Sequence, residues 1–142
     1  MTIVITMAGL GSRFRKAGYK VPKYMIEAHG KTLFEWSMES LEGFDLQNST
    51  CIFIVRKEDQ ASDFIYSTCK KIGIGDAKIV ELDYLTDGQA TTAMLAADVW
   101  DKQDSLMIYN IDTYVEAGQM KTEQICGDGF IPCFHADGDH WS

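Results

Sequence analysis

The sequence predicts an α/β fold, a three-layer αβα sandwich in which a mostly parallel sheet carries helices on both faces. Three observations lead to this expectation. Short runs of apolar and β-branched residues, typical of strands buried on both faces, recur along the chain. Between them lie segments whose apolar residues repeat at helical spacing and end near glycine. The two kinds of segment alternate, as they do in β-α-β units.

The expected strands are residues 3–8, 51–55, 78–82 and 105–111, and a weaker segment at 130–135 is a candidate fifth strand. Thr32 and Glu35 fit a capping box that opens a helix ending near Gly43. Glu58 and Asp59 are expected to open a second helix, which ends at Gly73. A third helix follows the turn at 86–89. The apolar stripes of the second and third helices are Ala61, Phe64, Ile65, Thr68, Cys69 and Ile72, and then Ala93, Ala96, Ala97 and Trp100.

Length and composition indicate an ordinary globular protein. The 142 residues predict a single domain covering 1–142, with no repeat or linker. No apolar run approaches the roughly 20 residues of a membrane span, and no signal peptide is expected at the N-terminus. The four cysteines lack metal-ligand spacing, which favours buried free thiols and a cytoplasmic location. A net charge of −8 argues against binding to nucleic acid or anionic membranes.

Positive charge is concentrated at the N-terminus. Residues 13–23 contain five basic residues and no acidic one, and residues 1–31 carry a net +5 against −13 for the rest. This basic stretch follows a glycine-rich loop at the end of the first expected strand. Such a combination predicts a site for a polyanion.

Three polar or glycine-rich features follow expected strands directly: the loop after the first strand, the turn at 86–89, and Asp112. Ligands of open parallel sheets bind at the carboxyl ends of the strands. We therefore expect these three features to lie together and to form one binding site.

Two familiar phosphate motifs fit the first loop poorly. Gly9 and Gly11 begin a dinucleotide fingerprint, but Phe14 occupies the position of its third small residue. Gly30-Lys31-Thr32 imitates the end of a P-loop, but Met25 stands in place of its first glycine and no strand directly precedes it.

A third interpretation joins four segments of the chain. In chain order they are MAGLGSRF, VPKYMIEAHGKTLFEW, TDGQATTA and IYNIDT. Together they resemble the sugar-phosphate nucleotidyltransferases, which are also called nucleoside-diphosphate-sugar pyrophosphorylases. The resemblance is to the branch that is found in bacterial capsule and surface-polysaccharide gene clusters. The resemblance runs from residue 2 to 142, with Thr32 where the family usually has proline. It implies a Rossmann-like, GT-A-like fold and transfer of a nucleotidyl group from a nucleoside triphosphate to a sugar 1-phosphate or another phosphorylated small molecule.

The resemblance also assigns roles to residues. Arg13 and Lys23 are the expected catalytic residues. The planar guanidinium of Arg13 can bind two phosphate oxygens at once, and the ammonium of Lys23 acts as a compact positive charge. Asp112 is the expected ligand of Mg²⁺. The residues expected to bind the nucleotide are Ala8, Gly9, Leu10, Gly11, Ser12, Gly88 and Gln89. Arg15, Lys16 and Lys20 are expected to be solvated loop charges.

Several alternatives stay open. A strand-terminal aspartate such as Asp112 also caps turns. The segment at 135–140 contains four potential metal ligands, but we expect it to form a hairpin turn rather than a metal site. The family's substrate-phosphate lysine and second metal aspartate have no counterpart before residue 142, so we expect an apparently truncated N-terminal fragment. A non-catalytic nucleotide-binding module and a dehydrogenase remain as alternative functions, and the sequence leaves open a homo-oligomer.

Overall fold

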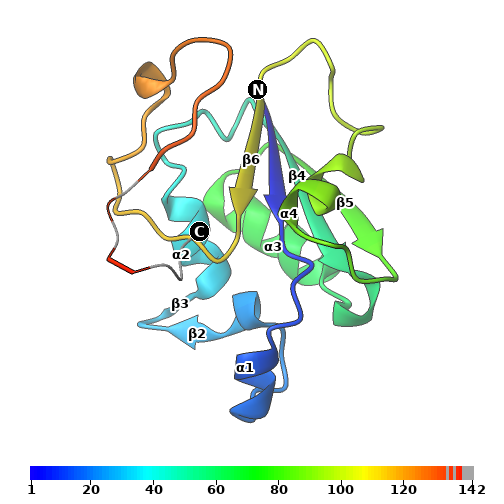
Figure 1. Ribbon diagram of the computed structural model, residues 1–142. Coiled ribbons are helices and arrows are strands. Elements are labelled where there is room, and N and C mark those ends of the chain that lie inside the picture. Colours follow the sequence, from blue (N-terminus) through cyan, green and yellow to red (C-terminus); the bar gives the residue numbers. More distant parts are fainter. Residues whose placement is uncertain (134, 136, 139–142) are drawn as a thin grey trace.

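The computed structural model describes residues 1–133, 135 and 137–138. At its centre lies a four-stranded sheet of order β5-β4-β1-β6, in which all neighbouring strands are parallel (Figure 1). The strands are β1 (Thr2–Thr6), β4 (Thr50–Arg56), β5 (Asp76–Leu82) and β6 (Leu106–Asn110). All four expected strands are present, which confirms the α/β prediction.

The two central strands are buried on both faces. Ile3 and Ile5 of β1 point into one apolar cluster, whereas Val4 between them points into another. β4 alternates in the same way, with Phe53 in the first cluster and Ile52 in the second. This double burial is the reason that both strands are continuously apolar in sequence.

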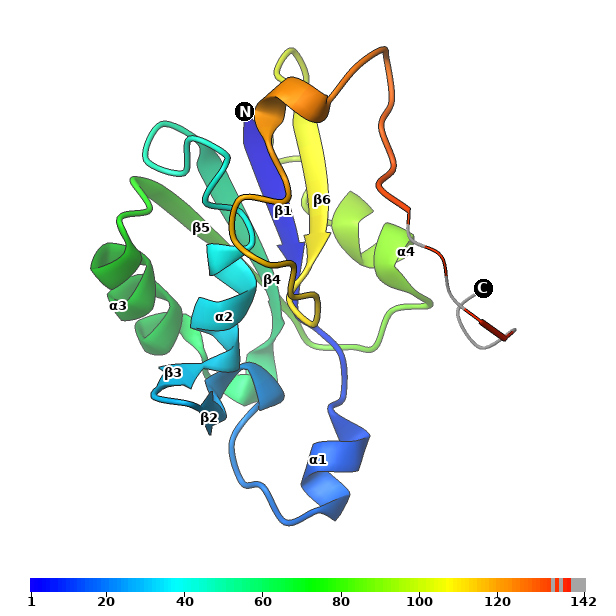
Figure 2. The same cartoon turned by 90° about the vertical axis from the view of Figure 1, so that its left-hand side faces the viewer.

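Helices cover both faces of the sheet (Figure 2). α2 (Leu33–Glu39) and α3 (Ser62–Ile72) pack on the face that holds the larger cluster, where Phe34 and Phe53 have ring centroids 5.4 Å apart. α4 (Gln89–Met94) covers the opposite face through the buried Ala93 and, just beyond its end, Ala96. The three-layer arrangement is therefore as predicted.

The predicted start of α2 is confirmed atom by atom. The Thr32 hydroxyl accepts from the Glu35 backbone N–H at 3.2 Å, and Glu35 accepts from the Thr32 N–H at 2.8 Å. The Lys71 ammonium, on α3, donates to the same carboxylate at 2.6 Å. This hydrogen bond and the cap lower the pKa of Glu35.

A small hairpin of β2 (Glu27–Ala28) and β3 (Lys31–Thr32) precedes α2. Its turn is His29-Gly30, and both residues have positive φ, as two-residue hairpin turns require. Gly30-Lys31-Thr32 therefore forms a hairpin and not a phosphate loop, which agrees with the rejection of the P-loop interpretation. The hairpin itself was not predicted, because two strands of two residues leave no periodic pattern.

Two expectations were wrong. Glu58 and Asp59 do not open α3: they belong to the 3-10 helix η2 (Lys57–Asp59), and the left-handed Gln60 (φ 47°) separates it from α3. Residues 130–133 and 135 form no strand, and this apolar segment is exposed. The strand was expected from a short apolar run, and such a run alone cannot show whether a partner strand lies beside it.

The expectation for the cysteines was partly wrong. Cys51 and Cys69 are buried free thiols as expected, whereas Cys126 and Cys133 are exposed.

The predicted turn at 135–140 lies largely outside the described residues. Within the described part of the chain, no helix is long and apolar enough to cross a membrane.

Candidate active site at the carboxyl ends of β1 and β6

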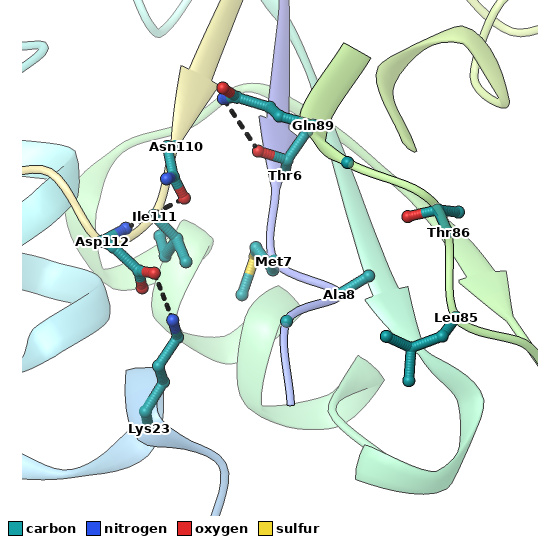
Figure 3. Close-up of a pocket in the computed structure, with 12 residues that line it drawn as sticks. Thr6, Met7, Ala8, Lys23, Leu85, Thr86, Gln89, Asn110, Ile111 and Asp112 are labelled. Carbon is teal, nitrogen blue, oxygen red and sulfur yellow. Dashed lines mark hydrogen bonds and ion pairs between the residues drawn. The ribbon is translucent and has the colours of Figure 1, made fainter. Parts of the chain in front are cut away.

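A cavity of about 220 Å³ opens where β1 and β6 end (Figure 3). It collects side chains from four separate stretches of the sequence. The lining residues are Thr6, Met7, Ala8, Gly9, Lys23, Leu85, Thr86, Gly88, Gln89, Asn110, Ile111 and Asp112. The structure thus brings together the three features that the sequence placed at strand ends, because parallel strands deliver their carboxyl ends to one edge of the sheet.

Lys23 and Asp112 are in direct contact, although 89 residues separate them in sequence. Lys23 begins the 3-10 helix η1 (Lys23–Met25), and Asp112 lies two residues beyond β6. Figure 3 shows the ammonium group pointing to the carboxylate across the mouth of the cavity. Lys23, the expected catalytic cation, and Asp112, the expected metal ligand, therefore lie side by side at the cavity.

The glycine-rich loop runs along the same edge, between β1 and α1 (Ser12–Lys16). Gly11 takes a left-handed conformation (φ 58°), and a Cβ on Gly9 would stand 3.7 Å from the Lys23 Nζ. In the described part of the chain, the N–H groups of residues 9–12 donate to no backbone oxygen. Free N–H groups beside a lysine form a suitable environment for a polyanion.

Gln89 and Gly88 form the opposite wall. The Gln89 amide nitrogen donates to the Thr6 hydroxyl at 3.2 Å, which fixes the side chain across the end of β1 (Figure 3). Gly88 has φ 118° and ψ 174°, a conformation that is available essentially only to glycine. A turn of this kind lets the chain pass close to the cavity with no side chain in the way.

The predicted residues divide between the cavity and its surroundings. Ala8, Gly9, Lys23, Gly88, Gln89 and Asp112 line the cavity. Leu10 and Gly11 line a smaller hollow under the loop, and Ser12 and Arg13 begin α1 and line neither space. The catalytic role of Arg13 stays a prediction, since its exposed side chain is outside the cavity in this conformation.

Arg15 has a different environment from a fully solvated charge. Its guanidinium lies 3.5 Å from carboxylate oxygens of both Glu58 and Asp59. Asp59 also accepts from the Tyr24 hydroxyl at 3.2 Å, and burial raises the pKa of this aspartate. Arg15 therefore fastens α1 to η2 and does not point into the cavity.

Six lining residues had been given no role from the sequence: Thr6, Met7, Leu85, Thr86, Asn110 and Ile111. All of them lie within one to three positions of a predicted site residue, and four of them belong to the segments on which the resemblance rests. Their position at strand ends was a usable signal, but their side-chain directions were not, because these depend on the turn that follows each strand.

The donor set of the cavity suits a hard cation. Asp112 offers a half-exposed carboxylate, and its backbone N–H donates to the Asn110 side-chain oxygen at 3.4 Å. No cluster of three or more acidic, histidine or cysteine side chains exists among the described residues. One carboxylate fits Mg²⁺, which keeps several waters and shares its ligands with substrate phosphates.

No protein-family model matches the chain, and no curated protein matches its sequence. Among solved structures, the chain is 43% identical to a nucleoside-diphosphate-sugar pyrophosphorylase from Vibrio cholerae RC9, with a TM-score of 0.70 over 79% of this chain and 48% of that one. The predicted resemblance to sugar-phosphate nucleotidyltransferases is confirmed by this similarity.

Two more distant structures share the fold. One is the inositol-1-phosphate CTP transferase from T. maritima, with 19% identity and a TM-score of 0.65 over 78% of this chain and 43% of that one. The other is a nucleotidyl transferase from Methanothermobacter thermautotroptrophicus, with 16% identity and a TM-score of 0.56 over 82% of this chain and 52% of that one. The chain thus spans about half the length of the solved structures that it matches.

Proposed function

We propose that this chain provides the nucleotide-binding part of a nucleotidyltransferase, which transfers a nucleotidyl group from a nucleoside triphosphate to a sugar 1-phosphate. One observation carries the proposal: Lys23, Asp112, the glycine-rich loop and the Gly88–Gln89 turn line one cavity at the carboxyl edge of the sheet. The 43% identity to the Vibrio cholerae nucleoside-diphosphate-sugar pyrophosphorylase supports both the reaction type and a sugar phosphate as acceptor.

The reaction forms one bond and breaks one. A phosphate oxygen of the acceptor attacks the α-phosphorus of the triphosphate, and the bond from that phosphorus to the β-phosphate oxygen breaks, so that pyrophosphate leaves. Negative charge builds up on the phosphate oxygens, and catalysis consists largely of positioning and electrostatic stabilisation. No proton has to be removed from the acceptor, because its phosphate is already ionised at neutral pH.

The residues of the cavity divide this work between them. The ammonium of Lys23 and the free N–H groups of residues 9–12 bind the phosphates, while Gly88 and Gln89 border the space for the base and ribose. Arg13, which lies on α1 directly after the glycine-rich loop, is the second cation that we propose for the phosphates. Mg²⁺ held by Asp112 would neutralise the developing phosphate charge.

The Lys23–Asp112 contact also suggests how the free site remains stable. Each group serves as counter-ion to the other while no nucleotide is present, which reduces the cost of holding both at the mouth of the cavity. A magnesium–triphosphate complex supplies both a cation for Asp112 and anions for Lys23. Binding is thus an exchange of partners for both side chains.

The test is release of pyrophosphate from ATP, GTP, CTP and UTP, each with Mg²⁺ and a panel of sugar 1-phosphates. We expect one triphosphate to be favoured and activity to depend on the acceptor. Lys23→Met and Asp112→Asn should abolish it, whereas Lys20→Met, which removes an equal charge from the exposed loop, should not. Tight nucleotide binding without pyrophosphate release from the full-length gene product would instead identify a non-catalytic nucleotide-binding module.

A further inference from the structure

Three hydrogen bonds hold the loop that carries Asp112: one from Ser37 on α2, one to Ser40 at the C-terminal end of α2, and one from Tyr109 in β6. The hydroxyl groups of Ser37 and Tyr109 both donate to the Thr113 carbonyl oxygen, each at 2.9 Å. Two residues further on, the Val115 backbone N–H donates to the Ser40 hydroxyl oxygen at 2.9 Å. These contacts follow Asp112 immediately in the chain and join it to a helix that lies more than 70 residues earlier in the sequence.

The three side chains are buried, and Tyr109 also packs in the larger apolar cluster. Ser37 and Ser40 are 2% and 1% exposed, and Tyr109 is 7% exposed. A serine within a helix commonly bonds the carbonyl one turn earlier, but Ser37 donates instead to a distant loop. The two serines lie three positions apart on a helix face otherwise made of Phe34, Met38 and Leu41, so they point in the same direction.

The other side of Asp112 is fixed as well. Thr113 N–H donates to the Asn110 carbonyl at 3.0 Å, which closes a tight turn at the end of β6. Tyr109 and Asn110 are themselves held in register against Ile5 and Thr6 of β1. The backbone on both sides of Asp112 is therefore tied to the sheet and to α2, while its carboxylate lines the cavity and contacts Lys23.

We propose that Ser37, Ser40 and Tyr109 are positioning residues for Asp112, which hold its carboxylate at the mouth of the cavity in the geometry that the metal–triphosphate complex requires. The proposal rests on the proposed function only in taking Asp112 as the metal ligand. Groups that orient a metal ligand commonly change metal affinity by about 10- to 100-fold when removed.

The test is the dissociation constant of Mn²⁺, measured by electron paramagnetic resonance in the presence of whichever of ATP, GTP, CTP or UTP the chain binds most tightly. We expect Ser37→Ala and Tyr109→Phe each to weaken Mn²⁺ binding about tenfold and the double variant to weaken it further. Asp112→Asn should reduce the affinity to that of Mn²⁺ for the triphosphate alone, which is measured without protein. Hydrogen exchange of the Val115 amide in the ligand-free chain should become faster in Ser40→Ala.

Thr32→Ala is the matched control. It removes the cap of the same helix and so destabilises α2, but it leaves all three hydrogen bonds to the loop in place. Unchanged Mn²⁺ affinity in this control, with weakened affinity in the loop variants, supports positioning. Affinity within twofold of the wild type in Ser37→Ala and Tyr109→Phe overturns the proposal, as does an equal loss in Thr32→Ala.

The outcomes separate this proposal from the proposed reaction. If the wild-type chain binds Mn²⁺ with a triphosphate but the full-length gene product releases no pyrophosphate with any acceptor, the transfer reaction fails while the affinity comparison still decides the role of the three hydroxyl groups. If Asp112→Asn binds Mn²⁺ as the wild type does, Asp112 is not the ligand and the positioning proposal is overturned.

Discussion

At the scale of single residues, the contact between Lys23 and Asp112 is the feature from which most of the chemistry follows. In the proposed function, the Lys23 ammonium occupies the place beside the Asp112 carboxylate that a divalent cation would take. Removal of the lysine should therefore make the carboxylate more available to metal, and we expect Lys23→Met to bind Mn²⁺ more tightly than the wild type when no nucleotide is present.

Paramagnetic broadening of the amide signals near residue 112 measures this affinity. Lys20→Met is the control, because it removes the same charge from an exposed part of the loop. Weaker Mn²⁺ binding in Lys23→Met than in Lys20→Met would contradict the exchange of partners described above.

Gly88 provides a second test at this scale. A Cβ at this position would meet no heavy atom within 4 Å, but its φ of 118° is unfavourable for every other residue. Gly88→Ala should lose about 1–3 kcal/mol in the free energy of unfolding or distort the turn before Gln89. Urea denaturation measures the loss, and Gly129→Ala, at an open position without a positive φ, should stay within about 0.5 kcal/mol of the wild type.

At the scale of secondary structure, sequence reasoning succeeded where burial or capping imposes a pattern. Double burial made β1 and β4 continuously apolar, and the capping box of Thr32 and Glu35 marked the start of α2. It failed where short-range geometry decides. The left-handed Gln60 delays the start of α3, and nothing in the local composition announces that conformation.

The candidate site shows the same division. Strand ends were identifiable, and with them Gly9, Gly88, Gln89 and Asp112. The hydroxyl groups that hold the Asp112 loop were not, because Ser37 and Ser40 acquire a role only when α2 and the end of β6 are packed together.

The capping of α2 gives a prediction with a definite pH dependence. Hydrogen bonds from Lys71 and Thr32 lower the pKa of Glu35 in the folded chain, so its ionised form stabilises the fold above its unfolded pKa and that stabilisation disappears as the pH falls below this value. Glu35→Gln, which can keep the capping contacts but not the ion pair, should lower the urea midpoint at neutral pH, and its difference from the wild type should shrink as the pH falls through the lowered pKa of Glu35.

Urea denaturation at several pH values checks this expectation. Glu116→Gln, which changes an exposed carboxylate outside helices and strands, should leave the midpoint unchanged throughout. A difference between Glu35→Gln and the wild type that grows as the pH falls would show that the sign is wrong.

At the scale of the whole molecule, charge is distributed unevenly. The chain has a net charge of −8, yet residues 13–23 contain five basic residues and no acidic one. A triphosphate approaching the cavity meets a positive segment on a negative protein. Its affinity should therefore fall several-fold when salt rises from about 0.01 M to about 0.15 M, which shortens the Debye length from about 30 Å to about 8 Å.

The pattern among variants distinguishes direct contact from general attraction. Lys16→Gln with Lys20→Gln should reduce the salt dependence and leave affinity at high salt nearly unchanged, because these lysines are exposed and do not line the cavity. Lys23→Met should lose affinity at every salt concentration. Equal effects in both variants would show that no single lysine contacts the phosphates.

On the proposed function, the cavity between β1, β6 and α4 binds a magnesium–triphosphate complex through Lys23 and Asp112. Isothermal titration calorimetry of the wild-type chain, Lys23→Met and Asp112→Asn with ATP, GTP, CTP and UTP in the presence of Mg²⁺ measures this binding. We predict saturable one-to-one binding of at least one triphosphate and an affinity loss of about tenfold or more in each variant. Binding of no triphosphate, or binding that neither substitution weakens, would contradict it.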